Sequence, residues 1–299
     1  MTVGISLQKH EMSFKRQPVM PKIAILVLGC ASGRYVELID TIRRTWGQKQ
    51  IANVDIYYVF GTVNEAAAHT ALTRWLRGEI PPLEDGGICD VDKVLVTGCP
   101  DSIYVQEDCI LRKRLIAFDY LASERDYDFI HTVCAASYVD QYELVRHVDQ
   151  VAGRSLVSGA LGIDTSGRAP FVSGASMLLS ADVARSLASH RNDIVRENQF
   201  GFRDDVALGQ WIAEHLSGVP MEEIMDAIVN GRSLPQDSIF VSSSYTTIDY
   251  VMAEADRFRP RRNVFHYHFH SAKAQAMADF HDRYFLHQTR SLWANFPQP

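Results

Sequence analysis

The sequence predicts an α/β fold in which helices cover both faces of a mixed, mostly parallel central sheet. Residues 22–30, KIAILVLGC, form an unbroken aliphatic run, which is typical of a central strand that is covered on both faces. Two further apolar runs, 54–61 and 92–98, alternate with helical patterns at 32–47 and 64–78. With 299 residues, of which 46% are hydrophobic and 22% are charged, the chain can bury a large core.

The rest of the chain continues this alternation less regularly. A loop rich in proline, glycine and acidic residues is expected at 79–90. We expect helices at 107–123, 141–151, 181–190 with Ser180 as N-cap, 202–216 and 273–293, and strands at 126–134, 155–162, 169–180 as a strand pair, 237–243 and 263–270.

Charge and cysteine content narrow the class of protein. The formal net charge of −6 argues against a phosphate-rich partner, such as DNA, held over a broad surface. Five cysteines make an odd number without CxxC spacing, which favours free thiols in a reducing cytoplasm. No run reaches the ~18 apolar residues that a membrane span needs, and the opening residues lack the apolar segment of a signal peptide. We therefore expect a flexible polar leader at 1–20, followed by a single domain at 21–299.

The signatures GxGxxG, GxxxxGK[ST], GxSxG and HExxH are absent, but four local patterns are candidates for a site. In the first, IRRTWG at 42–47, Arg43 and Arg44 either reach a ligand or are solvated at the end of an amphipathic helix. In the second, Asp204 and Asp205 either present a general base to a cleft or stabilise their own helix through its dipole.

The other two patterns lie on expected strands. Gly174, between small residues, either lets a backbone approach a ligand closely or marks a β-bulge. In FHYHFH, His266, His268 and His270 project to one face of a strand. Three imidazoles on one face either bind a metal, as in a hydrolase, or form a solvated edge.

Taken in order, these segments resemble the inverting glycosyltransferases of the β1,3-galactosyltransferase and Fringe group, which have the GT-A fold. That family has an IRxTW-like helix end, here 42–46, and a glycine-containing strand that ends in Ser before a helix, here 173–187. It also has an acidic pair before Val and Gly, here 204–209, and a C-terminal His segment, here 265–270. The resemblance covers roughly 22–270 and implies a GT-A-like, Rossmann-type α/β/α sandwich.

The family's metal-binding aspartates are missing from this chain. In the family, the strand equivalent to 126–132 delivers three aspartates that hold a divalent metal, whereas this chain continues with Val133, Cys134, Ala135, Ala136 and Ser137. Small residues do not supply the carboxylate oxygens that hard divalent ions prefer. Three explanations are open: the chain is a metal-independent transferase, it is an inactive relative, or it carries the aspartate motif elsewhere in its sequence.

We favour metal independence, because basic residues near the C-terminus would balance the charge of a diphosphate leaving group. Mn²⁺ or Mg²⁺ is therefore not expected. These residues are Arg257, Arg259, Arg261, Arg262, His266, His268, His270 and Lys273.

The resemblance implies transfer of a hexose or pentose from a nucleotide-diphosphate donor, such as a UDP-sugar, to a hydroxyl group. The acceptor would be a glycan, a lipid-linked glycan or a modified nucleic acid in a bacterial or viral host cytosol. The alternative is an inactive nucleotide-sugar or glycan binding protein. The implied site consists of Asp205 as base, Asp204 as its partner, Gly174 and Ser176 on the acceptor side, and Gly29, Cys30, Arg43, Arg44, Ala135, Ala136, His268 and Lys273 on the donor side.

Overall fold

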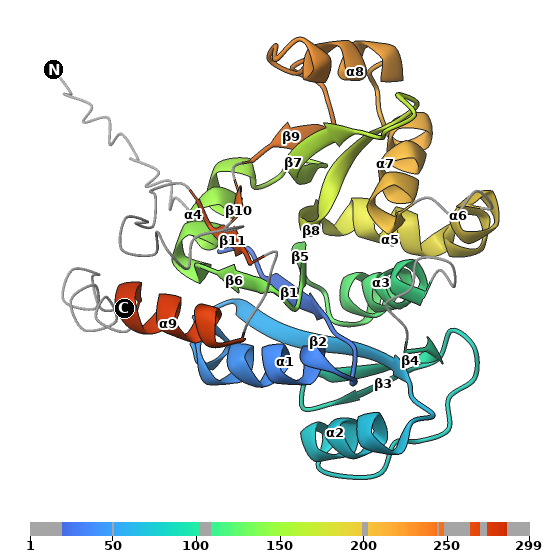
Figure 1. The fold of residues 1–299 in the computed structure, drawn as a ribbon. Helices are drawn as coiled ribbons and strands as arrows, with labels where there is room; N and C mark the ends of the chain where they lie inside the picture. The colour runs from blue at the N-terminus through green and yellow to red at the C-terminus, as the bar shows by residue number, and fades with distance from the viewer. Residues whose placement is uncertain are drawn as a thin grey trace, which may run out of the picture.

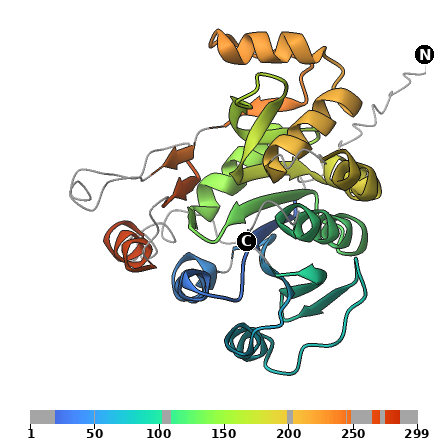
Figure 2. The ribbon, with the colours of Figure 1, turned by 45° about the vertical axis from the view of Figure 1, so that its right-hand side comes forward.

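The computed structural model describes residues 20–49, 51–101, 109–198, 203–243, 245–247, 264–269 and 274–285. A mixed sheet crosses the centre of the molecule, with helices on both of its faces (Figure 1, Figure 2). This arrangement confirms the predicted α/β sandwich. The sheet has eight strands in the order β3 (Ile88–Val91), β4 (Val94–Pro100), β2 (Val54–Thr62), β1 (Ile23–Leu28), β5 (Phe129–Cys134), β8 (Pro170–Ser180), β7 (Val157–Ile163) and β9 (Phe240–Ser242).

The centre of the sheet is parallel. β1 pairs in parallel with β2 and β5, and Leu28 lies beside Val59 and Cys134, so the carboxyl ends of these strands meet at one edge. Within the described sheet, β1–β2, β1–β5, β2–β4 and β7–β9 are parallel, and β3–β4, β5–β8 and β7–β8 are antiparallel.

Alternate side chains of β1 enter two separate cores, as period-2 geometry requires. Ile23, Ile25 and Val27 belong to one buried cluster, and Ala24 and Leu26 belong to the other. Both faces of β1 are therefore buried, which explains its unbroken aliphatic sequence. The first core is shared with α1 (Arg34–Arg44), α2 (Ala66–Leu76), α4 (Gln141–Val151) and α9 (Ala274–Tyr284), and the second with α3 (Cys109–Asp119), α5 (Ala181–Ser189), α6 (Arg191–Glu197), α7 (Asp204–His215) and α8 (Met221–Val229).

A small second sheet brings the C-terminal His segment to the end of β5. Its strands are β10 (Tyr245–Thr247), β11 (His266–His268) and β6 (Ser137–Val139), and His268 pairs with Ser137. The indole of Trp46 is fully buried and donates a hydrogen bond to the Ser137 carbonyl oxygen at 3.0 Å. Trp46 of the IRRTWG segment therefore holds this second sheet against α1.

Most of the elements that the sequence predicts are present, but one loop prediction and one strand prediction need correction. The segment 79–90, expected as a loop, contains most of β3, which turns back into β4 through Asp92 and Lys93. Both turn residues have positive φ, 52° and 65°, as tight hairpin turns require. The segment 169–180 was expected to form a strand pair, but it is the single long strand β8. This strand pairs with β5 on one side and with β7 on the other.

Three further differences concern helices. Ser180 precedes α5 as predicted, but its hydroxyl accepts a hydrogen bond from the Leu156 backbone N–H at 2.9 Å and makes no capping bond. The helix expected at 107–123 is described from Cys109 and ends in a π-helical turn, Tyr120–Glu124. The sequence patterns did not predict α6 and α8, which are short.

Among the described residues, every helix is too short or too polar to cross a bilayer.

Candidate functional site

Asp101, the residue after β4, ties together the carboxyl ends of three strands. Its Oδ2 accepts a hydrogen bond from the Ala31 N–H at 2.7 Å, and its Oδ1 accepts one from the Gly61 N–H at 2.9 Å. Lys113 of α3 donates from Nζ to Asp101 Oδ1 at 2.9 Å and to the Gly29 carbonyl oxygen at 2.8 Å. Both side chains of this ion pair are only 1% exposed. The loop that follows β1 is thus fixed at the edge where α/β sheets bind ligands.

The predicted donor residues Gly29 and Cys30 lie in this loop. A Cβ at Gly29 would lie only 2.6 Å from the ring of Phe60, so packing alone requires glycine there. The thiol of Cys30 is buried and lies 3.2 Å from the Ser32 hydroxyl. Burial and the nearby Asp101 carboxylate raise the pKa of Cys30, so its thiol stays protonated at neutral pH. The structure therefore gives Gly29 and Cys30 structural roles at the predicted edge.

The acidic pair lies at the first turn of α7, where the helix dipole favours negative charge. Asp205 Oδ2 accepts a hydrogen bond from the Gly174 N–H of β8 at 2.9 Å, and Oδ1 accepts one from its neighbour Val206 at 3.0 Å. Asp204 Oδ2 lies 2.6 Å from Nη1 of Arg114, and Nη2 of Arg114 donates to the Gly174 carbonyl oxygen at 3.2 Å. Helices α3 and α7 and strand β8 thus meet at one cluster, which we call the carboxylate cluster: Arg114, Gly174, Asp204 and Asp205.

Gly174 lets these groups approach closely. A Cβ at position 174 would lie 3.2 Å from Asp205 Cβ and 3.4 Å from Arg114 Nη2. The sequence predicted that Gly174 permits a close approach, and in the structure the approaching groups are these two side chains.

The two carboxyl groups of the cluster have different surroundings. Burial is the main cause that raises the pKa of Asp205, and the negative charge of Asp204 adds to it. The backbone N–H of Gly174 and the charge of Arg114 oppose the rise without cancelling it. Asp204 has Arg114 as its direct counterion, and the Arg114 side chain is 1% exposed. A carboxylate with a raised pKa beside a charge-paired one is a pattern typical of general bases.

The small-residue loop after β5 offers no carboxylates. Ala135 is fully buried, the Ala136 carbonyl oxygen accepts a hydrogen bond from Phe269 N–H at 2.9 Å, and Cys134 Sγ lies 3.4 Å from His268 Nδ1. Burial raises the pKa of Cys134, which disfavours the thiolate that binds metals. Within the described ranges, no group of three or more His, Cys, Asp or Glu side chains is arranged to hold a metal ion. These residues do not fit the metal site of the family that the sequence resembles.

Ser176, predicted on the acceptor side, faces the interior. It is 2% exposed, and its Oγ lies 3.1 Å from Nε2 of the fully buried His131. It lies at the start of the fully buried part of β8, which runs from position 176 to 180. Ser176 is therefore a hydrogen-bond partner for one nitrogen of a buried imidazole.

His131 lies beside His266, which is also fully buried. Their rings lie 5.9 Å apart, and Nε2 of the half-buried His147 lies 3.2 Å from the Ser158 hydroxyl. Burial lowers the pKa of His131 to about 3, lowers that of His147, and lowers that of His266 well below its ordinary value. His266, expected to help balance a diphosphate, is fully buried and neutral, so it supplies no positive charge.

We expect this burial to make the fold sensitive to acid. The unfolded chain binds a proton at His131 near pH 6.5, whereas the folded protein binds it only near pH 3, so stability falls as pH decreases through this window. At about pH 4.5 the loss from His131 alone should be about 2–3 kcal/mol. Urea unfolding at about pH 7 and at about pH 4.5 measures it. His131→Asn should reduce the difference between the two pH values, whereas exposed His69→Asn should not; an unchanged difference in the first variant would contradict the assignment.

Arg43 and Arg44 lie far from the predicted donor residues. They end α1, which starts beside the carboxyl ends of the strands and runs back toward the opposite edge, and its 11 residues span ~16 Å. The guanidinium of Arg43 lies 5.3 Å from the centre of the Tyr58 ring, and Arg44 Nε donates to the Asp40 carbonyl oxygen at 3.2 Å. The structure thus does not bring these arginines to Gly29 and Cys30.

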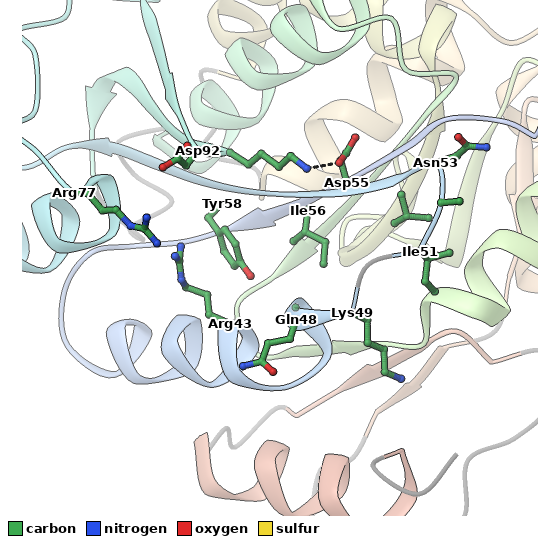
Figure 3. Close-up of a pocket in the computed structure, with 14 residues that line it drawn as sticks. Arg43, Gln48, Lys49, Ile51, Asn53, Asp55, Ile56, Tyr58, Arg77 and Asp92 are labelled. Atoms are coloured by element: carbon green, nitrogen blue, oxygen red, sulfur yellow. Dashed lines mark hydrogen bonds and ion pairs between the residues drawn. The ribbon is translucent and has the colours of Figure 1, made fainter. Parts of the chain in front are cut away.

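Arg43 instead lines a wide depression at the amino edge of the strands (Figure 3). Its volume is about 1120 Å³, and it does not include the carboxylate cluster. It is bordered by the end of α1, the start of β2, Arg77 after α2, and the β3–β4 turn at Asp92 and Lys93.

Several predicted residues lie outside the described ranges, and no placement is assigned to them: Arg257, Arg259, Arg261, Arg262, His270 and Lys273.

The sequence reasoning missed Asp101, Lys113 and Arg114. A signal for the two basic residues was present: in CILRKRLIAF, apolar residues surround the basic ones on every side of a helix, so some of them must be buried with partners. Their acidic partners are 12 and 90 residues away in the chain, as the pairs Asp101–Lys113 and Arg114–Asp204 show, and only folding brings them together.

Comparisons with known proteins bear mainly on the fold. No family model and no curated protein matches the chain. Among solved structures, the chain is similar to a glycosyltransferase involved in the glycosylation of the major capsid of PBCV-1, with 10% identity and a TM-score of 0.42. The alignment covers 88% of this chain and 100% of that chain. A likeness at this level concerns the path of the chain and says nothing about its reaction.

Proposed function

We propose that this protein is an inverting glycosyltransferase that moves a sugar from a nucleotide-diphosphate donor to a hydroxyl acceptor. The observation that carries the proposal is the carboxylate cluster: Asp205 has a raised pKa, lies at the carboxyl edge of the sheet, and adjoins the glycine of β8 and the arginine of α3. The order of sequence segments that resemble the β1,3-galactosyltransferase and Fringe group supports the same reaction.

In the proposed step, Asp205 acts as general base. The acceptor oxygen forms a bond to the anomeric carbon while the bond from that carbon to the diphosphate oxygen breaks on the opposite face. The acceptor proton passes to Asp205, and the diphosphate leaves with the bonding electron pair. Raising the pKa of a carboxylate toward neutral pH strengthens it as a base while it remains ionised.

Arg114 and Asp204 position this base. Arg114 Nη1 lies 2.6 Å from Asp204 Oδ2, and Arg114 Nη2 donates to the carbonyl oxygen of Gly174, whose N–H donates to Asp205. The charge of Asp204 in turn contributes to the raised pKa of Asp205. Contacts between α3, α7 and β8, which are far apart in sequence, therefore hold the proposed base and acceptor side in place.

The donor would lie beside the loop after β1, which Asp101 and Lys113 hold in place. The ammonium of Lys113 is already bound to the Asp101 carboxylate and to the Gly29 carbonyl oxygen, so it stabilises the loop. Balance of the diphosphate charge is proposed for the arginines at 257–262 and Lys273, since the loop after β5 lacks the carboxylates that would hold a bridging metal.

We expect turnover to be metal-independent. Addition of EDTA in excess should leave the rate of sugar transfer unchanged, because the described residues near the cluster offer no hard-ion ligand set. The measurement is the rate of nucleoside diphosphate release before and after chelation, with re-addition of Mn²⁺ or Mg²⁺ as control. A loss of activity on chelation that Mn²⁺ restores would contradict the prediction.

A panel of UDP-, GDP- and TDP-linked hexoses and pentoses tests the function itself. Nucleoside diphosphate release by liquid chromatography identifies the donor, and mass spectrometry of added glycans, lipid-linked glycans or modified nucleic acid identifies the acceptor. Release with one donor, and loss of release in a variant of Asp205, would support transfer. Binding of a donor without release under any condition would support an inactive relative.

The second candidate is that inactive relative, a nucleotide-sugar or glycan binding protein. The replacement of carboxylates by Cys134, Ala135 and Ala136 favours it, because lost metal ligands accompany lost catalysis in enzymes that depend on a metal. A binding protein has no need for a carboxylate with a raised pKa, and this feature of Asp205 makes the transferase the better supported function.

A further inference from the structure

We propose that the depression at the amino edge of the sheet is a binding site for a phosphate monoester, separate from the carboxylate cluster. Its central feature is a pair of arginines, Arg43 and Arg77, which come from the ends of α1 and α2. Figure 3 shows their guanidinium groups pointing toward one another across the depression.

These two arginines have no counterion in the described part of the chain, where none of the ion pairs includes either of them. The other cations of the lining are already engaged. Lys93 forms an ion pair with Asp55, and the ammonium of Lys49 lies 5.9 Å from the centre of the Tyr142 ring. Figure 3 shows the Lys49 side chain directed away from the two arginines.

Tyr58 of β2 holds Arg43 in place. The guanidinium carbon of Arg43 lies 5.3 Å from the centre of the Tyr58 ring, within the range of a cation–π contact. Tyr58 is 6% exposed, so its ring is a rigid platform. An arginine that is positioned before the ligand arrives loses less conformational entropy on binding.

Charge and size select the ligand. Two converging guanidinium groups repel each other, and a dianion between them removes that repulsion. A phosphate monoester carries close to two negative charges at neutral pH and accepts bidentate hydrogen bonds from arginine, whereas a carboxylate or a phosphate diester carries one charge. The depression, at about 1120 Å³, is much larger than a phosphate ion, so there is room for the molecule that bears the phosphate.

Binding can be measured by ³¹P NMR titration of the full chain with inorganic phosphate, glucose 1-phosphate and dimethyl phosphate. We expect both dianions to bind and the monoanionic diester to bind about tenfold more weakly or not at all. Tighter binding of glucose 1-phosphate than of inorganic phosphate assigns the site to an ester on a larger molecule, and equal binding assigns it to free phosphate.

Variants test the two arginines. Arg43→Gln and Arg77→Gln should each weaken binding about 10- to 100-fold, because each removes a charge-assisted hydrogen bond. Exposed Arg154→Gln makes the same change of charge elsewhere and should bind normally. Arg43→Lys keeps the positive charge but loses the planar guanidinium group that can donate two parallel hydrogen bonds. Circular dichroism confirms that each variant is folded. No binding of either dianion at millimolar concentration, or unchanged binding in both Gln variants, would overturn the proposal.

The proposal does not depend on glycosyl transfer. Asp205→Asn lies outside the depression and should leave phosphate binding intact, so failure of the proposed reaction and failure of this site give different results.

Discussion

Replacing Asp205 with Asn is expected to reduce sugar transfer by about 10²- to 10⁴-fold while the folded protein remains about as stable as before. Asn cannot take the acceptor proton. Its one side-chain oxygen can still accept the hydrogen bond from the Gly174 N–H, whereas the bond from the Val206 N–H to the second carboxylate oxygen is lost. Because the folded protein raises the pKa of Asp205, the ionised form is less favourable in the folded than in the unfolded state. A neutral side chain at this position therefore removes a cost of folding at neutral pH.

The measurements are nucleoside diphosphate release, donor affinity by calorimetry and thermal unfolding of the same preparations. Donor affinity should persist. Asp226→Asn, which alters a half-exposed carboxylate paired with Arg232, is the matched control and should keep full activity. Near-normal turnover of the Asp205 variant would refute its role as base, and a large loss of stability would assign it to the fold.

Asp204 provides a second readout of the same cluster. Its charge is one of the causes that raise the pKa of Asp205, so Asp204→Asn should move the acidic limb of the pH–rate profile to lower pH. A merely structural Asp204 would lower the rate without moving the profile.

Replacing Lys113 with Met is expected to lower the free energy of unfolding by about 3–5 kcal/mol. The substitution leaves the Asp101 carboxylate, which is 1% exposed, without its counterion, and removes the hydrogen bond to the Gly29 carbonyl oxygen. An unpaired buried charge is costly because the surrounding medium is a poor substitute for water. The loop after β1 would at the same time lose one of the two side chains that anchor it, and Asp101 would remain bound to the Ala31 N–H.

Urea unfolding measures this effect. Lys93→Met is the matched control, because the Lys93–Asp55 pair is 48% and 36% exposed and should contribute about 1 kcal/mol or less. The double variant Lys113→Met with Asp101→Asn should recover part of the loss, since it removes the orphaned charge. Equal effects of the two lysine substitutions would show that burial of the Asp101–Lys113 pair has no energetic importance.

The predicted elements were most accurate where local periodicity is strong. The aliphatic run at 22–30 contains β1, and the helix predicted at 141–151 has the bounds of α4. β3 and the single strand β8 were mistaken because short strands and long strands in mixed pairing depend on their neighbours in the sheet.

The sequence by itself determined the α/β alternation, the central position of β1 and the presence of Asp204 and Asp205 at a helix start, because these follow from spacing along a few neighbouring residues. Tertiary structure alone decided that α1 carries Arg43 to the amino edge, that Arg114 pairs with Asp204, and that His131 and His266 are buried together. Such contacts join residues on elements far apart in the chain. They depend on how whole helices and strands pack, and spacing within one element does not encode that packing.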